Sequence, residues 1–203
     1  MIINSYTLVP YIVGHGTASN FDTGVSGNND NLRFEFGIEI NKLAKMFAVF
    51  GNFVDNDHNC WDFTTGNIDV STANRQLSCH ANDRVSTGFS IGEQGYPSNK
   101  MDVILDRSNC TVLFENDTNY ITVIHLNGIS NNTNIAIGAK SVGLGQISDI
   151  ETKHYYWKIY DGNTLIRDYV PVIRNSDHAV GLFDKINFTF NPSTGAAPFT
   201  YEN

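Results

Sequence analysis

Charged residues and prolines are scarce in this sequence, and basic residues are the scarcer of the charged ones. Only 17% of its 203 residues are charged, and 21 acidic residues against 13 lysines and arginines give a formal net charge of −8. This balance repels a phosphate backbone and no basic stripe offsets it, so we do not expect nucleic-acid binding. Five prolines and 41% hydrophobic residues argue against a disordered chain and allow a sizeable core.

Long apolar runs and an even set of cysteines are also missing. No run approaches the length of a transmembrane helix, so we expect no membrane insertion. The segment from Met1 to Tyr6 lacks the basic and apolar regions of a signal peptide, so we expect no export signal. Three cysteines, Cys60, Cys79 and Cys110, cannot all pair within one chain, and we expect free, mostly buried thiols.

What the sequence does contain is a succession of short strand patterns separated by turn residues. Leu32 to Ile40 alternates apolar and polar residues, which predicts one buried face made of Leu32, Phe34, Phe36, Ile38 and Ile40. Lys45 to Phe53 is apolar on both sides and predicts a central strand. Further strands are expected at 60–63, 87–91, 101–105, 111–115, 120–126, 134–139 and 185–190.

The most informative stretch is a hairpin pattern in the last third of the chain. Aromatic and β-branched runs at 154–160 and 164–172 flank the turn Asp161-Gly162-Asn163. Trp157 is predicted to be a core residue, with Tyr155 and Ile159 on its own face. No linker-like break in composition occurs, so we expect a single domain over residues 1–203.

Several short motifs occur in a recognisable order at the two ends of the chain. They are Tyr11-Ile12-Val13-Gly14-His15-Gly16-Thr17, Phe21-Asp22-Thr23-Gly24-Val25, Lys158-Ile159-Tyr160, Leu165-Ile166-Arg167-Asp168-Tyr169-Val170-Pro171 and Gly181-Leu182-Phe183-Asp184. Together they resemble concanavalin A-like (LamG-like) jelly-roll domains, which are common on bacteriophage virions and bacterial surface proteins. The resemblance covers about half the chain and implies an all-β fold, a two-sheet antiparallel jelly-roll sandwich. It implies no catalytic motif and no fixed set of ligands.

The motif residues also have structural interpretations, which we favour. Asp161-Gly162 suits the positive backbone dihedrals of a tight hairpin. Pro171 is expected to end a strand or to lie at an edge. Arg167 and Asp168 are expected to pair with neighbours and fasten the C-terminal hairpin.

Catalytic patterns are weak in this sequence. Relatives with glucanase activity would carry a Glu-x-Asp-x-x-Glu string, whereas here Gly37 separates Glu35 from Glu39 and nothing acidic completes the set. We interpret both glutamates as solvent-facing partners of Arg33. The six histidines are scattered, and no Gly-x-Ser-x-Gly elbow is present, so the chain is not expected to be an enzyme.

A polar loop supplies the best candidate for a metal site. The oxygens of Asp55, Asp57 and Asn59 occupy alternate positions, which suits calcium. An EF-hand is excluded because Cys60 takes the glycine position and Gly66 that of the bidentate glutamate. A solvated loop without an ion explains the same residues, and we expect no other cofactor.

Aromatic residues near this loop are candidates for glycan binding. Trp61 and Tyr96 could stack on sugar rings, with His58 as a polar neighbour. The alternative for Trp61 is a place in the core, since it lies in an apolar-alternating strand.

The resemblance, together with the missing export signal and the lack of catalytic motifs, implies a non-enzymatic bacteriophage virion protein, exposed to the outside after lysis. A head fibre, a capsid decoration or a tail-fibre module would bind host-surface glycans or other virion proteins, and we expect a homo-oligomer, by analogy a trimer. The alternatives are a carbohydrate-binding module of a bacterial surface or secreted protein, and a purely structural subunit. The structural subunit would expose apolar patches matched to its neighbours.

Overall fold

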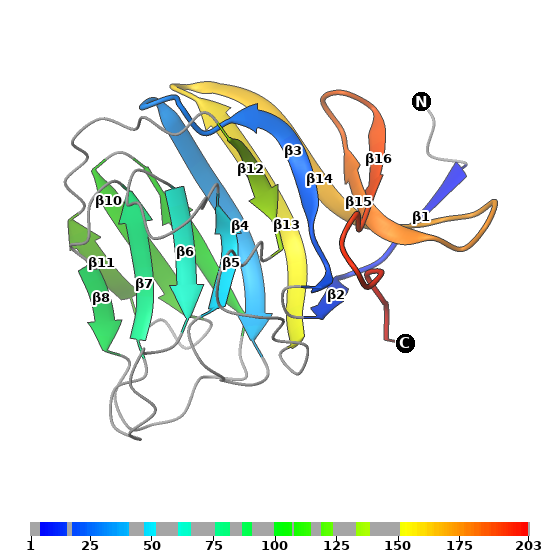
Figure 1. Cartoon of the computed structure of the whole chain (residues 1–203), viewed down its shortest axis with the longest axis horizontal. Coiled ribbons are helices and arrows are strands. Elements are labelled where there is room, and N and C mark those ends of the chain that lie inside the picture. The colour runs from blue at the N-terminus through cyan, green and yellow to red at the C-terminus, as the bar shows by residue number, and fades with distance from the viewer. Residues whose placement is uncertain are drawn as a thin grey trace.

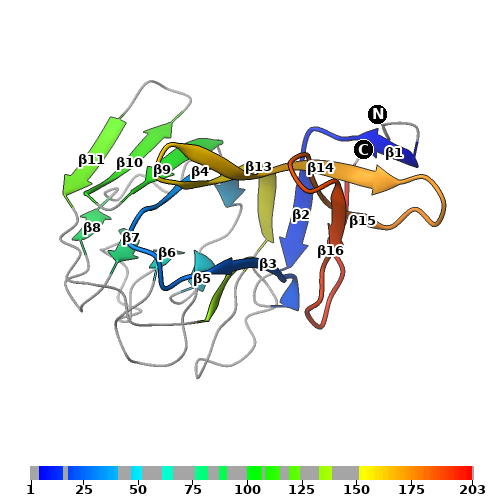
Figure 2. The ribbon, with the colours of Figure 1, turned by 90° about the horizontal axis from the view of Figure 1, so that it is seen from above.

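The architecture is a pair of facing antiparallel sheets (Figures 1 and 2). A computed structural model describes residues 5–15, 18–40, 47–51, 61–65, 76–81, 87–90, 100–106, 108–114, 119–123, 133–138 and 151–202. Every strand pairing in these residues is antiparallel, and no α-helix occurs among them. The predicted all-β jelly-roll sandwich of two sheets is confirmed.

We call the two layers the large sheet and the small sheet. The large sheet has the order β11-β10-β9-β4-β13-β14-β15-β16, with β1 and β2 attached to β14 and β13. Its strands are β1 (Tyr6–Leu8), β2 (Ile12–His15), β4 (Leu32–Ile40), β9 (Met101–Leu105), β10 (Asn109–Phe114), β11 (Asn119–Val123), β13 (Glu151–Asp161), β14 (Thr164–Arg174), β15 (Val180–Asp184) and β16 (Thr189–Pro192).

The small sheet covers the inner face of the large one. It has the order β3-β12-β5-β6-β7-β8. Its strands are β3 (Phe21–Ser26), β5 (Phe47–Gly51), β6 (Trp61–Thr65), β7 (Gln76–Ala81), β8 (Thr87–Ser90) and β12 (Asn134–Ile137). No described helix is long and apolar enough to cross a membrane.

The core forms where the inward-facing residues of the two sheets meet. All five apolar residues predicted on the buried face of β4 are at most 1% exposed. Aromatic rings fill the space between the sheets: the Trp157 ring stacks on Phe36 at 4.1 Å between centroids, and Phe50 of the small sheet contacts both of them. The central position of β5 is also confirmed, since Val49 and Phe50 are both buried. One core cluster draws on both sheets, while the single-domain assignment of residues 1–203 stays a prediction.

A β-bulge interrupts the alternation of β13. His154 lies opposite Ile38 of β4, and Tyr156 lies opposite the next residue along β4, Gly37. The register therefore shifts by one residue, and Tyr155 is the extra residue of the bulge. Such a bulge places two successive residues on one face. Trp157 is buried as predicted, but the expectation that Tyr155 shares its face is wrong: Tyr155 and Tyr156 both lie on the outer face, half-buried.

Beyond the sandwich, the large sheet continues as a region that we call the wing. It comprises β1 and residues 170–192, which are the end of β14, the strands β15 and β16, and the turns between them (Figure 2). In this region β14 no longer pairs with β13. It pairs with β1 instead, and Leu8 lies opposite Val172. The β13 strand in turn pairs with β2. The two N-terminal strands therefore fill the positions where β13 and β14 part.

The C-terminal segment closes one end of the sandwich. Thr200 forms an isolated bridge with Val13 of β2, and the amide of Ala197 donates to the carbonyl of Ala18. The Phe199 side chain, 2% exposed, inserts into the core between Phe21 of the small sheet and His154 of the large sheet.

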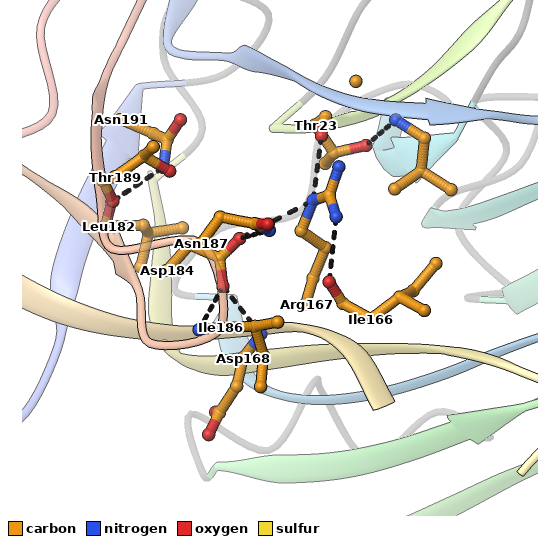
Figure 3. A network of polar contacts seen from close by, with 12 residues as sticks. Thr23, Ile166, Arg167, Asp168, Leu182, Asp184, Ile186, Asn187, Thr189 and Asn191 are labelled. Carbon is orange, nitrogen blue, oxygen red and sulfur yellow. Dashed lines mark hydrogen bonds and ion pairs between the residues drawn. The ribbon is translucent and has the colours of Figure 1, made fainter. Parts of the chain in front are cut away.

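Figure 3 shows how three of the sequence motifs meet at the base of the wing. The buried Asp184 carboxylate accepts the amides of Asp168 and Ile186 and lies 3.6 Å from Nε of Arg167. Arg167 Nε also donates to the carbonyl of Thr23, on the edge strand of the small sheet. The predicted fastening role is confirmed, because Asp168 likewise pairs with Lys185 at 2.6 Å.

Two further expectations, one about a strand and one about the cysteines, were wrong. The predicted strand 185–190 is a turn followed by β16, because the Asp184 carboxylate accepts the Ile186 amide and holds the chain in a turn. The cysteines are not all free thiols, since Cys110, which faces the core from β10, is disulfide-bonded. An odd cysteine count excludes complete pairing, and it does not exclude one bond.

Candidate functional site

Of the residues predicted from sequence as a binding site, only Trp61 lies in the described part of the chain. Trp61 is 0% exposed, and its ring contacts Phe34 with centroids 5.3 Å apart. Its predicted role in stacking on a glycan is therefore wrong, because no ligand reaches a ring enclosed between two sheets. The remaining candidates, Asp55, Asp57, His58, Asn59 and Tyr96, lie outside the described residues.

A different site lies on the outer face of the large sheet, over β4, β9 and β13. We call it the tyrosine face, because tyrosine rings there alternate with charged side chains. Its members, half-buried, are Tyr11, Arg33, Glu35, Glu39, Lys100, Asp102, Lys153, Tyr155, Tyr156, Lys158, Tyr160 and Tyr201. Strand alternation brings these side chains to the face opposite the core. Three carboxylates organise it, and each binds one tyrosine hydroxyl and one cation.

The first of these groups is centred on Glu35 of β4. Arg33, two residues away on the same strand face, forms an ion pair with Glu35 Oε1. The hydroxyl of Tyr160 donates to Glu35 Oε2 at 3.1 Å. The guanidinium of Arg33 lies over the Tyr160 ring, 5.0 Å from its centroid, so the three side chains contact one another in turn. The predicted pairing of Glu35 with Arg33 is confirmed.

The second group depends on the missing side chain of Gly37. The hydroxyl of Tyr156 donates to Asp102 Oδ1 at 2.9 Å, and Lys100 Nζ lies 3.4 Å from the same oxygen. To reach Asp102 on β9, the Tyr156 ring crosses β4 directly over Gly37. A Cβ atom added at Gly37 would lie 2.7 Å from Tyr156 Cε1 and 3.1 Å from Asp102 Oδ1. Glycine is therefore required at this position by a close approach, and its backbone φ plays no part.

The third group is centred on Glu39, near the end of β4. Lys153 Nζ donates to Glu39 Oε1 at 3.1 Å, and the Tyr155 hydroxyl donates to Glu39 Oε2 at 2.8 Å. Glu39 was expected to be a partner of Arg33, and the structure gives it Lys153 instead. Lys153 also lies over the Tyr11 ring, 4.8 Å from its centroid.

Three tyrosine rings continue this group as a row. The Tyr11 ring lies between those of Tyr155 and Tyr201, with centroid distances of 5.6 and 6.1 Å. The row joins β13, the residue that precedes β2 and the C-terminal segment, so it draws on residues far apart in the sequence.

The electrostatics of the face follow from these contacts. Burial, together with the hydrogen bond to Asp102, raises the pKa of Tyr156 well above its usual range. Burial and the hydrogen bond to Glu35 raise the pKa of Tyr160 in the same way. The hydrogen bond to Glu39 raises the pKa of Lys153. Near neutral pH the tyrosines are therefore fixed as hydroxyl donors and the lysine as a cation.

A buried histidine on β13 lies on the core side of the large sheet, beneath the tyrosine face. His154 precedes the bulge, is 1% exposed and accepts a hydrogen bond at Nδ1 from Nε1 of Trp157, 3.1 Å away. Burial lowers its pKa to about 3, so the ring is neutral at ordinary pH. Among the described residues no group of three His, Cys, Asp or Glu side chains is placed to hold a metal ion.

The chemistry available here is that of a rigid hydrogen-bonding surface with aromatic rings. Tyrosine oxygens and carboxylates retain unused lone pairs, and lysine ammonium groups retain N–H donors. Such a surface can bind hydroxyl groups in both directions while its rings contact C–H groups.

Comparisons with known proteins add little to this description. No family model matches the chain, and no curated protein matches it either. The chain is similar to a solved structure concerning botulinum neurotoxin type C, which enters cells in dependence upon interaction with two ganglioside molecules. That alignment has 13% sequence identity and a TM-score of 0.42, and covers 77% of this chain and 41% of the other. The chain thus spans less than half of that protein, and a similarity at this level establishes neither family nor ligand.

Proposed function

We propose that this chain is a non-enzymatic adhesion module that binds a glycan through its tyrosine face, displayed on a bacteriophage virion. The observation that carries the proposal is the set of three carboxylates on that face, each holding a tyrosine hydroxyl at 2.8 to 3.1 Å. Polar groups and ring faces are thereby fixed before any ligand arrives, which lowers the entropic cost of binding.

The same contacts argue against glycosidase chemistry. A glycosidase needs one carboxylic acid to protonate the leaving group and a second carboxylate to act as nucleophile or base. On the tyrosine face each carboxylate accepts a tyrosine hydroxyl and pairs with a cation. All three carboxylates are engaged in holding the surface together, and their remaining lone pairs can accept hydroxyl groups of a ligand, which supports a binding role.

Display outside the cell is supported by sequence resemblance and by the disulfide at Cys110. The motifs at both ends of the chain resemble jelly-roll domains common on phage virions. Disulfides persist mainly outside the reducing cytosol, which suits a protein that works after lysis. Calcium at Asp55, Asp57 and Asn59 and assembly as a homo-oligomer, for which we propose a trimer, belong to the same proposal.

A second candidate function, contact with other virion subunits, is favoured by the wing. Leu8 is 66% exposed, Phe188 63% and Ile186 42%. Leu8 lies on β1, and Ile186 and Phe188 lie in the turn that joins β15 to β16. Exposed apolar side chains can mark protein contacts. In this arrangement the wing would attach the module and leave the tyrosine face free. A carbohydrate-binding module of a bacterial surface or secreted protein would use the same face.

The deciding experiment measures binding of the purified protein to host cells and to a glycan array. Replacing both Tyr11 and Tyr155 by alanine removes ring contact area and is expected to weaken binding about tenfold or more, since aromatic contacts contribute about 0.5–1.5 kcal/mol each. Phe188→Ala, which removes an exposed ring from the wing, is the matched control and should bind glycans normally. Unchanged binding by the tyrosine variant, or no glycan binding by the wild type, would refute the proposal.

A further inference from the structure

Three cations of the tyrosine face are already paired with carboxylates of the same face. Arg33 is paired with Glu35, Lys100 with Asp102 at 3.4 Å, and Lys153 with Glu39 at 3.1 Å. The carboxylate sits on the same sheet in each case, so the pair is in place without a ligand. An anionic ligand would have to displace a partner that is covalently tethered nearby.

The remaining cation of the described face has acidic surroundings. In the strand register, Lys158 lies opposite Glu35 on β4 and opposite Asp168 on β14. Asp168 is itself paired with Lys185, at 2.6 Å. The whole chain carries a formal net charge of −8, which adds a general repulsion of anions.

From this arrangement we infer that the tyrosine face selects uncharged, hydroxyl-rich sugars and discriminates against acidic ones. The inference rests on the proposed function and names its ligand class. A sugar hydroxyl can accept from a lysine N–H and donate to a tyrosine oxygen without breaking an ion pair. A sulfate or carboxylate on the same sugar meets bound carboxylates and loses hydration without gaining a cation.

The preference for neutral sugars should weaken when a cation is released. Glu39→Gln removes the charge that neutralises Lys153 and keeps the size of the side chain. Lys153 is the most useful target, because it lies over the Tyr11 ring at the end of the tyrosine row. A released ammonium group next to aromatic rings can then pair with an anionic substituent.

The test uses an array of neutral oligosaccharides, each printed beside its sulfated derivative, and measures the ratio of the two signals. We expect the wild type to favour the neutral member at least tenfold and Glu39→Gln to shift this ratio about tenfold toward the sulfated member. Asp102→Asn, which releases Lys100, provides a second variant should the first not fold, as checked by circular dichroism. Asp177→Asn is the control: it changes the net charge equally but breaks the Arg174 pair of the wing.

Different results would refute the selectivity for neutral sugars and the proposed glycan binding itself. Equal or stronger wild-type binding to the sulfated members overturns the inference and leaves glycan binding intact. An unchanged ratio in both released-cation variants, or an equal shift in Asp177→Asn, also overturns it. Absence of binding to every glycan refutes the proposed function itself, and the inference with it.

Discussion

The tyrosine face and the wing belong to the same side of one sheet, yet they differ in how their side chains are satisfied. By alternation along β14, Arg174 projects from the same side as Asp168, the register partner of Lys158. On the tyrosine face three ring hydroxyls and three cations are each bound to a carboxylate. On the wing, Tyr6 packs on Phe183 and Phe190 with centroids 4.9 and 5.6 Å apart, and Arg174 caps the Phe190 ring at 4.6 Å.

The difference shows that local backbone features, rather than the fold class, determine the chemistry of a sheet surface. A bulge and a glycine bring Tyr155 and Tyr156 to the outer face and allow one ring to cross β4. On the wing the turn after β15 ends in Phe188, which has a positive φ of 57° and a side chain 63% exposed. One region holds its polar groups against one another, and the other leaves apolar side chains exposed to water.

The largest expected effect is a loss of stability at the base of the wing. Asp184→Ala removes a carboxylate that is 1% exposed. Arg167 thereby loses its ion-pair partner, and two backbone amides lose their acceptor. Breaking a buried pair in this way costs about 3–5 kcal/mol of unfolding free energy. Urea unfolding should show this loss, and hydrogen exchange should locate it at β15 and β16. Asp177→Asn, in an exposed ion pair, should leave stability nearly unchanged; equal losses in both variants would contradict the assignment.

Lowering the pH should reduce the free energy of unfolding through His154, which is buried beneath the tyrosine face. The pKa of His154 is lowered from 6.5 to about 3 by burial, so below pH 6.5 the unfolded chain takes up a proton that the folded chain refuses. Stability is therefore lost as the pH falls from 6.5 toward 3, by up to about 1.4 kcal/mol per pH unit from this group. Urea unfolding followed by tryptophan fluorescence at pH 7 and pH 4.5 measures the loss. His154→Gln should reduce the slope, and an identical slope in that variant would exclude His154 as its source.

A single methyl group should disturb the tyrosine face without touching the wing. Gly37→Ala places a Cβ atom against the Tyr156 ring and displaces it from Asp102. Overpacking of this kind costs about 1–3 kcal/mol. The variant should also lose glycan binding in the array assay. Gly162→Ala is an instructive control, because a Cβ there meets nothing within 4 Å and only its positive φ of 57° is strained; it should lose stability but keep binding.

The smallest expected effect is a gain in stability on the wing. Phe188→Gly relieves a left-handed conformation that costs a bulky residue about 1–2 kcal/mol. Little burial is lost, since 63% of the side chain is exposed. Thermal unfolding should therefore show a rise in stability of about 1 kcal/mol at most. A loss of stability would mean that the ring has a packing role in the free protein.

The strands of the sandwich core were predictable because their side chains follow the period of two. Leu32 to Ile40 shows this alternation over nine residues, and the structure places β4 there. The hairpin was predictable from its turn, since Gly162 supplies the positive φ that the two-residue connection needs. The meander of β9, β10 and β11 likewise agrees with the predicted order.

The candidate site could not be predicted in the same way. A bulge leaves no signature in residue type, so uniform alternation placed Tyr155 on the inner face beside Trp157. Gly37 was visible in the sequence as an interruption between Glu35 and Glu39, and its role depends on a ring from β13 that is more than a hundred residues away. Trp61 was misassigned because an aromatic residue beside a polar loop has the same pattern whether it faces solvent or core.

The placement of the N-terminal strands has a consequence for how the protein folds. Within the described residues, β1 pairs with β14, and β2 pairs with β13 and bridges to Thr200. Each of these contacts joins segments more than 130 residues apart in the sequence, so a large loop must close before either strand gains a partner. Proteins rich in such distant pairings fold slowly, on the scale of milliseconds to seconds. During that interval the β14 strand of the wing lacks its β1 partner, and pairing of this strand with any other chain would compete with completion of the fold.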